Sequence, residues 1–328
     1  MKGYSSFSHS CIGETHIKRG IVCQDSTLSL DNSRYSFAAT ADGHGSLCYL
    51  RTDRGSEYAV DCAQSCVDEF LRNLNETDAD LNDEKQRTQL FDQLWRSIVA
   101  RWHSTAEEDF RFDPFSEEEL DRIPEQFGYY RERYLSGRYI EAYGTTLAFA
   151  VVTEDFALCA QIGDGSCVVF GDDGEAYEPV PEDPRCYDNV TTSMCQDDAA
   201  LSYRYVYFPK DEIPPAIFLG TDGIENSYWS KEQLHGFYRG LALTFCESGM
   251  QDGVRQLQVF LPEMTRRGSG DDVSCAGIID LERLRAIEDT LREMLNAEIE
   301  EPQEAVEPPV DDSDVIIAGS GDEPSADE

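Results

Sequence analysis

The sequence predicts an α+β protein, because segments with the pattern of strands and segments with the pattern of helices occur in separate runs. Residues 3–41 consist of extended segments divided by polar turns, and residues 144–180 consist of short apolar runs divided by turn dipeptides. Between these regions, apolar side chains recur at three- and four-residue steps, which is the period of an amphipathic helix. Runs of strands followed by runs of helices are typical of sheets covered by layers of helices.

Two long helices are predicted after the first strands. The first begins near Asp53 and the second covers about residues 90–102, since apolar residues keep the helical spacing in both. The stretch near 110–140 has helical spacing as well, but Pro124 and Gly128 interrupt it. We therefore expect an elaborated connection there.

Strands return in the second half of the chain, and helices follow them again. The run 144–180 has the pattern of an antiparallel meander, which we expect to form a second sheet. The turn-rich residues near 181–200 predict a surface loop or flap, and two further strands follow it. Helices at about 230–245 and 250–265, the strand VSCAGIID and a final helix from Leu281 to about residue 297 complete the pattern.

We expect one folded domain over residues 1–297 and an acidic disordered tail over residues 298–328. The tail is rich in Glu, Asp and Pro and almost without aromatic residues. Such a segment cannot bury enough apolar surface to offset its ordering entropy. Its short VIIA run at 315–318 is either a docking motif or an incidental apolar patch.

The charge of the chain excludes two classes of partner. Its 65 Asp and Glu residues against 27 Lys and Arg residues give a formal net charge of -38. This charge opposes binding to nucleic acid and to an anionic membrane surface, and no apolar run approaches the about 20 residues that span a bilayer.

The N-terminus and the cysteines indicate the compartment. The first residues contain no apolar core of a secretory signal, so we expect a cytoplasmic protein. The 11 cysteines are an odd number at irregular spacings, which favours reduced thiols over a disulfide framework.

Aspartates occur repeatedly where an apolar strand pattern ends and a glycine turn begins. A single Asp-Gly pair is usually only a turn, but the motifs ATADGHG, QIGDGS, TDGIEN and GSGDDVS all share the pattern. Oxygen ligands with few histidines select Mg²⁺ or Mn²⁺ over Zn²⁺. Two such ions can activate a water for in-line attack on a phosphoester. The aspartates in these motifs are Asp42, Asp164, Asp222, Asp271 and Asp272.

These motifs, in this order and together with HIKRGIVCQDS near the N-terminus, resemble those of the metal-dependent protein phosphatases of type 2C. Within that family, the Gln-Asp pair resembles the first motif of a bacterial branch. The resemblance covers about residues 5–280. It implies a four-layer α-β-β-α sandwich of two antiparallel sheets flanked by helices, and hydrolysis of phosphoserine and phosphothreonine.

The resemblance assigns metal ligands to the aspartates. Asp42 takes the position that bridges two Mn²⁺ or Mg²⁺ ions, and Gly43 takes that of a ligand through its carbonyl oxygen. Asp164 is a candidate for a third, weaker ion. The other implied ligands are Asp25, Asp222 and Asp271.

Further residues match positions around these ligands. Gln24 replaces a glutamate that organises metal-bound water in other branches, and Asp272 takes the place of an asparagine or aspartate behind the ligands. His44 directly follows the bridging motif and is the expected general acid for the leaving alkoxide, with a plain turn histidine as the alternative.

The phosphate-binding position differs from the family pattern. Many members carry an arginine five residues before the first aspartate, but Gly20 stands there in this chain. Lys18 and Arg19, in the same expected strand, are then the candidates to bind the substrate phosphate.

The resemblance implies a phosphorylated protein as the substrate, a serine/threonine kinase as the opposing enzyme, and a monomer as the working form. The acidic tail is expected to compete with phosphoanions at the metal site. The main alternative is a pseudophosphatase that acts as a regulatory binding module, although the retained ligand set argues against it. No loop has the spaced carboxylates of an EF-hand, and no G-x-S-x-G elbow is present.

Overall fold

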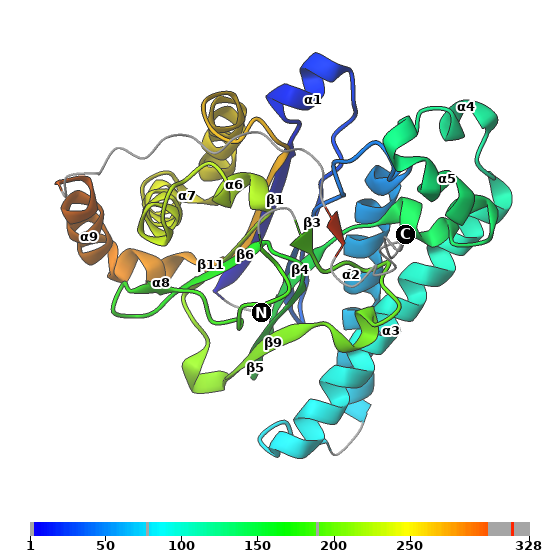
Figure 1. Cartoon of the computed structure of the whole chain (residues 1–328). Helices are drawn as coiled ribbons and strands as arrows, with labels where there is room; N and C mark the ends of the chain where they lie inside the picture. Colours follow the sequence, from blue (N-terminus) through cyan, green and yellow to red (C-terminus); the bar gives the residue numbers. More distant parts are fainter. Residues whose placement is uncertain (1–2, 77–78, 188–189, 301–315, 318–328) are drawn as a thin grey trace.

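The computed structural model describes residues 3–76, 79–187, 190–300 and 316–317, and in it two five-stranded sheets pack face to face with helices on both outer sides (Figure 1). One sheet has the strand order β1-β11-β10-β6-β7 and the other has the order β2-β3-β4-β5-β9. All pairs within these two sheets are antiparallel. The predicted α+β sandwich is therefore confirmed. Most of the predicted tail lies outside the described residues.

The predicted strands are present, but the chain distributes them differently between the sheets. We expected residues 144–180 to form a second sheet of their own, and this was wrong. β4 and β5 extend the sheet of β3, and the chain crosses to the other sheet at the turn 163–165, where β6 begins. The first sheet comprises β1 Tyr4–Cys11, β6 Ser166–Phe170, β7 Ala176–Tyr177, β10 Ala216–Gly220 and β11 Val273–Asp280. The second comprises β2 Ser26–Asp31, β3 Ser36–Ala41, β4 Leu147–Val152, β5 Phe156–Ile162 and β9 Arg204–Pro209.

Small and branched side chains fill the space between the sheets. Ala38, Ala150 and Cys159 from one sheet and Val169 and Ile217 from the other belong to a single buried cluster. The other faces of the same strands are covered by helices, so β3, β4, β5, β6 and β10 are buried along their whole length. Burial on both faces explains why these strands have continuous apolar runs instead of a clean alternation.

The first helical layer consists of α2 Thr52–Glu76 and α3 Glu84–Phe112. Both helices were predicted, and both are longer than the apolar spacing indicated. Trp95 and Trp102 of α3 are buried between the helices and the sheet of β3. The indole N–H of Trp102 donates to the carbonyl oxygen of Gly55 at 2.8 Å, which fixes α3 against α2.

The predicted connection near 110–140 is folded into short helices, among them α4 Glu117–Leu120 and α5 Gly128–Leu135. Arg51, which is only 2% exposed, binds this region to the start of α2. Its guanidinium forms ion pairs with Asp109 and Glu119, each at 3.1 Å. A buried cation with several acceptors holds the connection in one position.

The second helical layer covers the sheet of β1, on the side opposite α2 and α3 (Figure 1). The two helices expected at 230–265 are halves of α7 Lys231–Arg267, which is kinked at Gly249. The expected final helix is divided into α8 Leu281–Ala286 and α9 Glu288–Glu300. Within the described ranges, no helix combines the length and the hydrophobicity needed to cross a bilayer. All 11 cysteines are free thiols, as their number and spacing predicted.

Candidate metal centre

Five aspartates lie at one edge of the two sheets, each within two residues of a strand end. The strand pairing explains this, because the ends of antiparallel neighbours meet at a common edge. Ser26, next to Asp25, pairs with Ala41, next to Asp42. In the other sheet, Gly220 pairs with both Ser166 and Cys275. The five aspartates are Asp25, Asp42, Asp164, Asp222 and Asp271.

The carboxyl groups of this cluster interact strongly with one another. Burial raises the pKa of Asp42 well above its usual range, and the nearby charges of Asp222 and Asp25 raise it further. Burial also raises the pKa of Asp222 to about 7, and its carboxyl shares a hydrogen bond with that of Asp42. That hydrogen bond requires a proton on one of the two groups. A divalent cation between them would replace this proton and neutralise the repulsion.

Asp25 is held in place by hydroxyl groups. Thr221 donates its hydroxyl to Asp25 Oδ2 at 2.8 Å, and Ser274 forms a second side-chain hydrogen bond. Burial, followed by the charge of Asp272, nevertheless raises the pKa of Asp25 well above its usual range. The residue is thus oriented, but its charge is only partly compensated.

The donor atoms in this cluster suit hard divalent cations, because they are carboxylate, amide and carbonyl oxygens. Gln24 Oε1 is buried and has no hydrogen-bond partner among the described residues, so it is available to a bound water or cation. Gly43 permits close packing, since a Cβ there would lie 2.6 Å from the carbonyl oxygen of Gln24. In the ranges that the structure describes, however, no three His, Cys, Asp or Glu side chains already form a complete ligand set. The structure supplies the donors without a finished coordination geometry.

The sequence analysis did not identify His16, which is buried beside this cluster. His16 Nδ1 lies 2.9 Å from Asp272 Oδ1, and the residue is only 5% exposed. Burial alone would lower its pKa, but the hydrogen bond and the charge of Asp272, with the charge of Asp271, raise it. Its position within the first motif, HIKRGIVCQDS, was the signal that could have revealed it.

Asp272 joins three separate parts of the chain. Besides His16, it accepts hydrogen bonds from the backbone N–H groups of Gly13 and Gln24, both at 2.6 Å. Burial would raise its pKa, but these hydrogen bonds lower it. Asp272 therefore stays ionised and holds the segment before Asp25 against the loop that carries Asp271.

We expect His16→Ala to weaken binding of Mn²⁺ or Mg²⁺ by about 10–100-fold, the usual effect of removing a group that orients metal ligands. The reason is that Asp272 would lose the imidazole 2.9 Å from its Oδ1, and Asp271 would lose the same imidazole at 3.9 Å. Calorimetric titration of the metal-free full chain measures the change. Lys18→Ala is the matched control, because Lys18 lies on the same helix but is exposed, and its ion pair is with Glu14 of that helix. Equal affinities of His16→Ala and the wild type would contradict this role.

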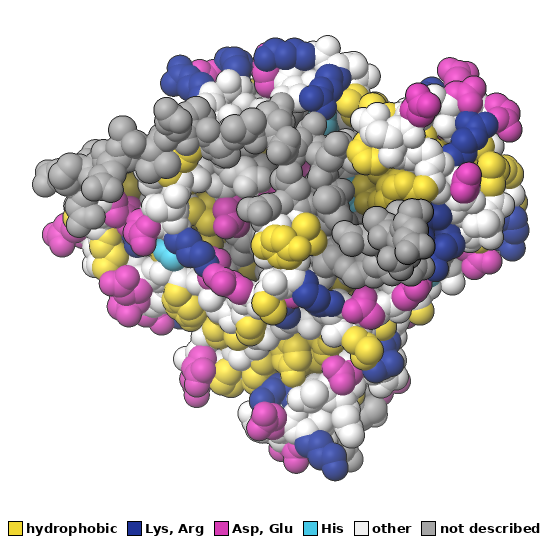
Figure 2. All heavy atoms as spheres, in the orientation of Figure 1, with side chains coloured by type: hydrophobic (Ala, Val, Ile, Leu, Met, Phe, Trp, Pro, Cys, Tyr) yellow, Lys and Arg dark blue, Asp and Glu magenta, His cyan; other side chains and the backbone are white. Residues whose placement is uncertain are grey.

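The residues expected to bind phosphate lie on a helix instead of a strand. α1 Glu14–Arg19 packs through its N-terminal end on the loop before β11, where the N–H of Thr15 donates to the carbonyl oxygen of Gly270. The expectation of a strand was wrong because the helix is short and ends at Gly20, whose φ is 70°. Lys18 and Arg19 are exposed on α1, and Figure 2 shows basic side chains gathered over it.

His44 lies close to the aspartates but is buried under another part of the chain. The residue is 2% exposed, and its ring contacts Tyr49 edge-on with centroids 4.8 Å apart. Its Nε2 is 2.8 Å from Ser193 Oγ, in the segment that was expected to be a flap. Burial lowers the pKa of His44 to about 3, so the imidazole is neutral near pH 7.

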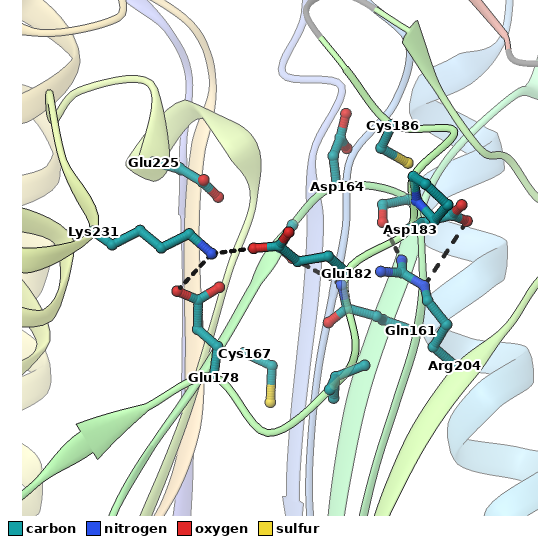
Figure 3. Close-up of a pocket in the computed structure, with 14 residues that line it drawn as sticks. Gln161, Asp164, Cys167, Glu178, Glu182, Asp183, Cys186, Arg204, Glu225 and Lys231 are labelled. Carbon is teal, nitrogen blue, oxygen red and sulfur yellow. Dashed lines mark hydrogen bonds and ion pairs between the residues drawn. The ribbon is translucent and has the colours of Figure 1, made fainter.

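The flap, residues 181–200, borders a cavity of about 480 Å³ that reaches Asp164 (Figure 3). Lys231 extends toward Glu178 and Glu182 on one side of it. On the other side, Arg204 donates to the carbonyl oxygens of Pro181 and Gly163, so it connects the flap to the turn that carries Asp164. The flap is not purely a surface loop, since Thr192, Ser193 and Met194 are fully buried.

Comparison with known proteins agrees with this architecture. The sequence profile described as "Protein phosphatase 2C" matches residues 12–261. Among solved structures, a variant of a bacterial serine phosphatase has 14% sequence identity and a TM-score of 0.51, covering 84% of this chain and 98% of that one. Stp1 from Staphylococcus aureus, a serine/threonine phosphatase, has 13% identity and a TM-score of 0.51 over 84% of this chain and 94% of its own.

The same fold occurs in a solved structure of an animal protein. A C. elegans sex-determining protein has 12% identity and a TM-score of 0.52, covering 88% of this chain and 68% of that one. At these identities the solved structures show the fold alone. No curated protein sequence matches the chain.

Proposed function

Because this chain belongs to the protein phosphatase 2C family, we propose that it removes phosphate from phosphoserine and phosphothreonine residues of proteins. The observation that carries the proposal is the group of buried, mutually repelling aspartates at one edge of the two sheets. Each lies on a different strand end, and burial together with mutual repulsion raises the pKa of Asp25, Asp42 and Asp222. Burying such a cluster costs free energy of folding, and bound cations would offset this cost by neutralising the carboxylates.

We propose that two Mn²⁺ or Mg²⁺ ions bind here, and that the carboxylate of Asp42 and the carbonyl oxygen of Gly43 would be among the ligands that hold them. Asp164, which interacts with Asp222, is the proposed ligand of a third, weaker ion. When bound, such ions lower the pKa of a water and neutralise charge on the phosphoryl group. The remaining proposed ligands are Asp25, Asp222 and Asp271.

The surrounding residues would orient this site. Asp272 holds the backbone of Gln24 and Gly13, and through them it fixes Asp25 relative to Asp271. Gln24 Oε1, which has no partner in the described chain, would accept a hydrogen bond from a water at the site. Lys18 and Arg19 are proposed to attract the substrate phosphate from the exposed side of α1.

We propose His44 as the group that protonates the leaving alkoxide, because it follows Asp42 by two residues. Since burial keeps the imidazole neutral near pH 7, His44 has to leave its buried position and gain a proton before it can act as the acid. Its Nε2 is bonded to Ser193 Oγ, so this bond must break before the ring can reach a leaving oxygen. The flap that carries Ser193 would therefore have to shift during turnover. Movement of the flap would thus free His44 for proton transfer at the same time as it changes the surroundings of the site.

The test of the function is phosphate release by the full chain from a phosphothreonine peptide and from an aryl phosphate, with Mn²⁺ or Mg²⁺ present. Release from both substrates is the expected result. Binding of the phosphopeptide without release would instead support the pseudophosphatase alternative. The further proposals are a monomer that acts in the cytoplasm and opposes a serine/threonine kinase.

A further inference from the structure

A segment of the C-terminal tail pairs with the flap beside the aspartate cluster. β12 Ile316–Ile317 runs parallel to β8 Val190–Thr191, with Ile316 opposite Val190 and Ile317 opposite Thr191. In Figure 1 the dark red arrow of β12 lies beside the green arrow of β8, whereas α9 lies on the outer side of the second helical layer. β12 thus lies at the flap, away from α9, which is the last long helix of the described chain.

β8 leads directly into the residues that contact the proposed catalytic groups. The hydroxyl of Thr191 forms a hydrogen bond with the Asp164 carboxylate. Thr192 Oγ1 accepts from the N–H of Gly163 at 3.0 Å, and Ser193 Oγ lies 2.8 Å from His44 Nε2. A strand that pairs with Val190 and Thr191 therefore contacts Thr191, which bonds Asp164, and ends two residues before Ser193, which contacts His44.

The edge of β8 is suited to this type of contact. Among the described residues, β8 has no other strand neighbour, and its only further pairing is the bridge between Tyr187 and Val190. Extended segments bind such edges through backbone hydrogen bonds. A two-residue strand is weak by itself, but a tether on the same chain gives an effective concentration of about the millimolar range or higher.

The composition of the tail adds an electrostatic effect. Asp311, Asp312 and Asp314 precede the paired residues by two to five positions in the sequence. Because they directly precede β12 in the sequence, these residues add negative charge to the segment that pairs with β8, whereas the substrate of the proposed site carries a phosphate dianion. Like charges disfavour the approach of that substrate.

We propose that β12, Ile316–Ile317, acts as an intramolecular inhibitor, which adds a strand to β8 and restricts the access of phosphoprotein substrates to the aspartate cluster. This inference rests on the proposed phosphatase function. A docked tail competes with the polypeptide of the substrate, so it raises the KM for a phosphopeptide more than it lowers kcat. If the tail is docked in most molecules, release of the tail lowers this KM by about 5–10-fold.

Proline substitutions in the full chain test the pairing. Ile316→Pro and Ile317→Pro each remove a backbone N–H and restrict φ, without changing the charge of the tail. Val306→Pro is the matched control, since it makes the same kind of change in the tail outside β12. The expected result is a KM for a phosphothreonine peptide that falls about 5–10-fold in the isoleucine variants and stays unchanged in the control. An unchanged KM in both isoleucine variants, or an equal fall in Val306→Pro, would overturn the proposal.

Hydrogen exchange gives a second measurement that does not depend on catalysis. In the full chain, the amides of residues 190–193 should exchange faster in Ile316→Pro than in the wild type or in Val306→Pro. Equal exchange in all three proteins would overturn the docking. A chain that shows the exchange difference but releases no phosphate from any substrate would contradict the proposed function and leave the docking intact.

Discussion

Asp222→Asn should reduce phosphate release by about 10³-fold, because a ligand in a two-ion site contributes several kcal/mol to the transition state. Asparagine keeps the shape of the side chain and the hydrogen bond from Asn226, which reaches Asp222 Oδ2 at 3.1 Å. The lost activity would then reflect the lost charge. Initial rates on a phosphothreonine peptide with saturating Mn²⁺ measure the effect.

The same substitution should stabilise the metal-free chain. Burial raises the pKa of Asp222 to about 7, above the about 3.9 of an unfolded aspartate. The stability linked to this group is therefore fully present below about pH 4 and is lost as the pH rises through 7. The asparagine side chain does not ionise, so the Asp222→Asn variant keeps this stability as the pH rises. Thermal unfolding should give a higher Tm for Asp222→Asn than for the wild type at pH 8 without metal, and a smaller difference at pH 5.

Glu225→Gln is the matched control for both effects. Burial raises the pKa of Glu225 to about 6, and this residue lies three positions after Asp222 without a proposed metal contact. The metal-free Glu225→Gln variant should have a higher Tm than the wild type at pH 8. Its phosphatase activity should stay within a few-fold of that of the wild type. Full activity of Asp222→Asn, or an equal loss in Glu225→Gln, would be incompatible with the proposed ligand set.

His44→Ala should slow the phosphothreonine peptide by about 10²-fold and an aryl phosphate by less than about tenfold. A threonine alkoxide is a poor leaving group that needs a proton, whereas an aryl oxide leaves without one. Comparing the loss of kcat on the two substrates distinguishes a role of His44 in proton transfer from a role in packing. An equal loss on both would show that His44 acts only as a packed side chain against Tyr49.

Much of the fold could be predicted from the sequence because strands and helices have different apolar periods. The helices α2, α3 and α7 were found in this way, although the kink at Gly249 made one helix look like two. The membership of each sheet could not be predicted, since it depends on long-range pairing. The turn at 163–165 looks like a hairpin in the sequence, but it carries the chain from one sheet to the other.

The aspartates of the site could be predicted from the sequence, whereas the residues that contact and orient the site could not. Aspartates at strand ends form a repeated local pattern, so Asp42 and Asp222 could be recognised one motif at a time. His16 was missed because its partner, Asp272, is more than 250 positions away in the chain. The contact of Ser193 with His44 also spans distant segments, 149 positions apart. Short sequence motifs cannot predict contacts between residues that are so far apart in the chain.

The metal requirement of the full chain is the most direct test of the account. The protein is first freed of cations with a chelator, which is then removed, and Mn²⁺ or Mg²⁺ is titrated while phosphate release from a phosphothreonine peptide is followed. We predict no release without a divalent cation and saturable recovery as it is added, with two ions bound per chain by calorimetry. Undiminished release from the cation-free protein would contradict the assignment of the aspartate cluster as the catalytic metal centre.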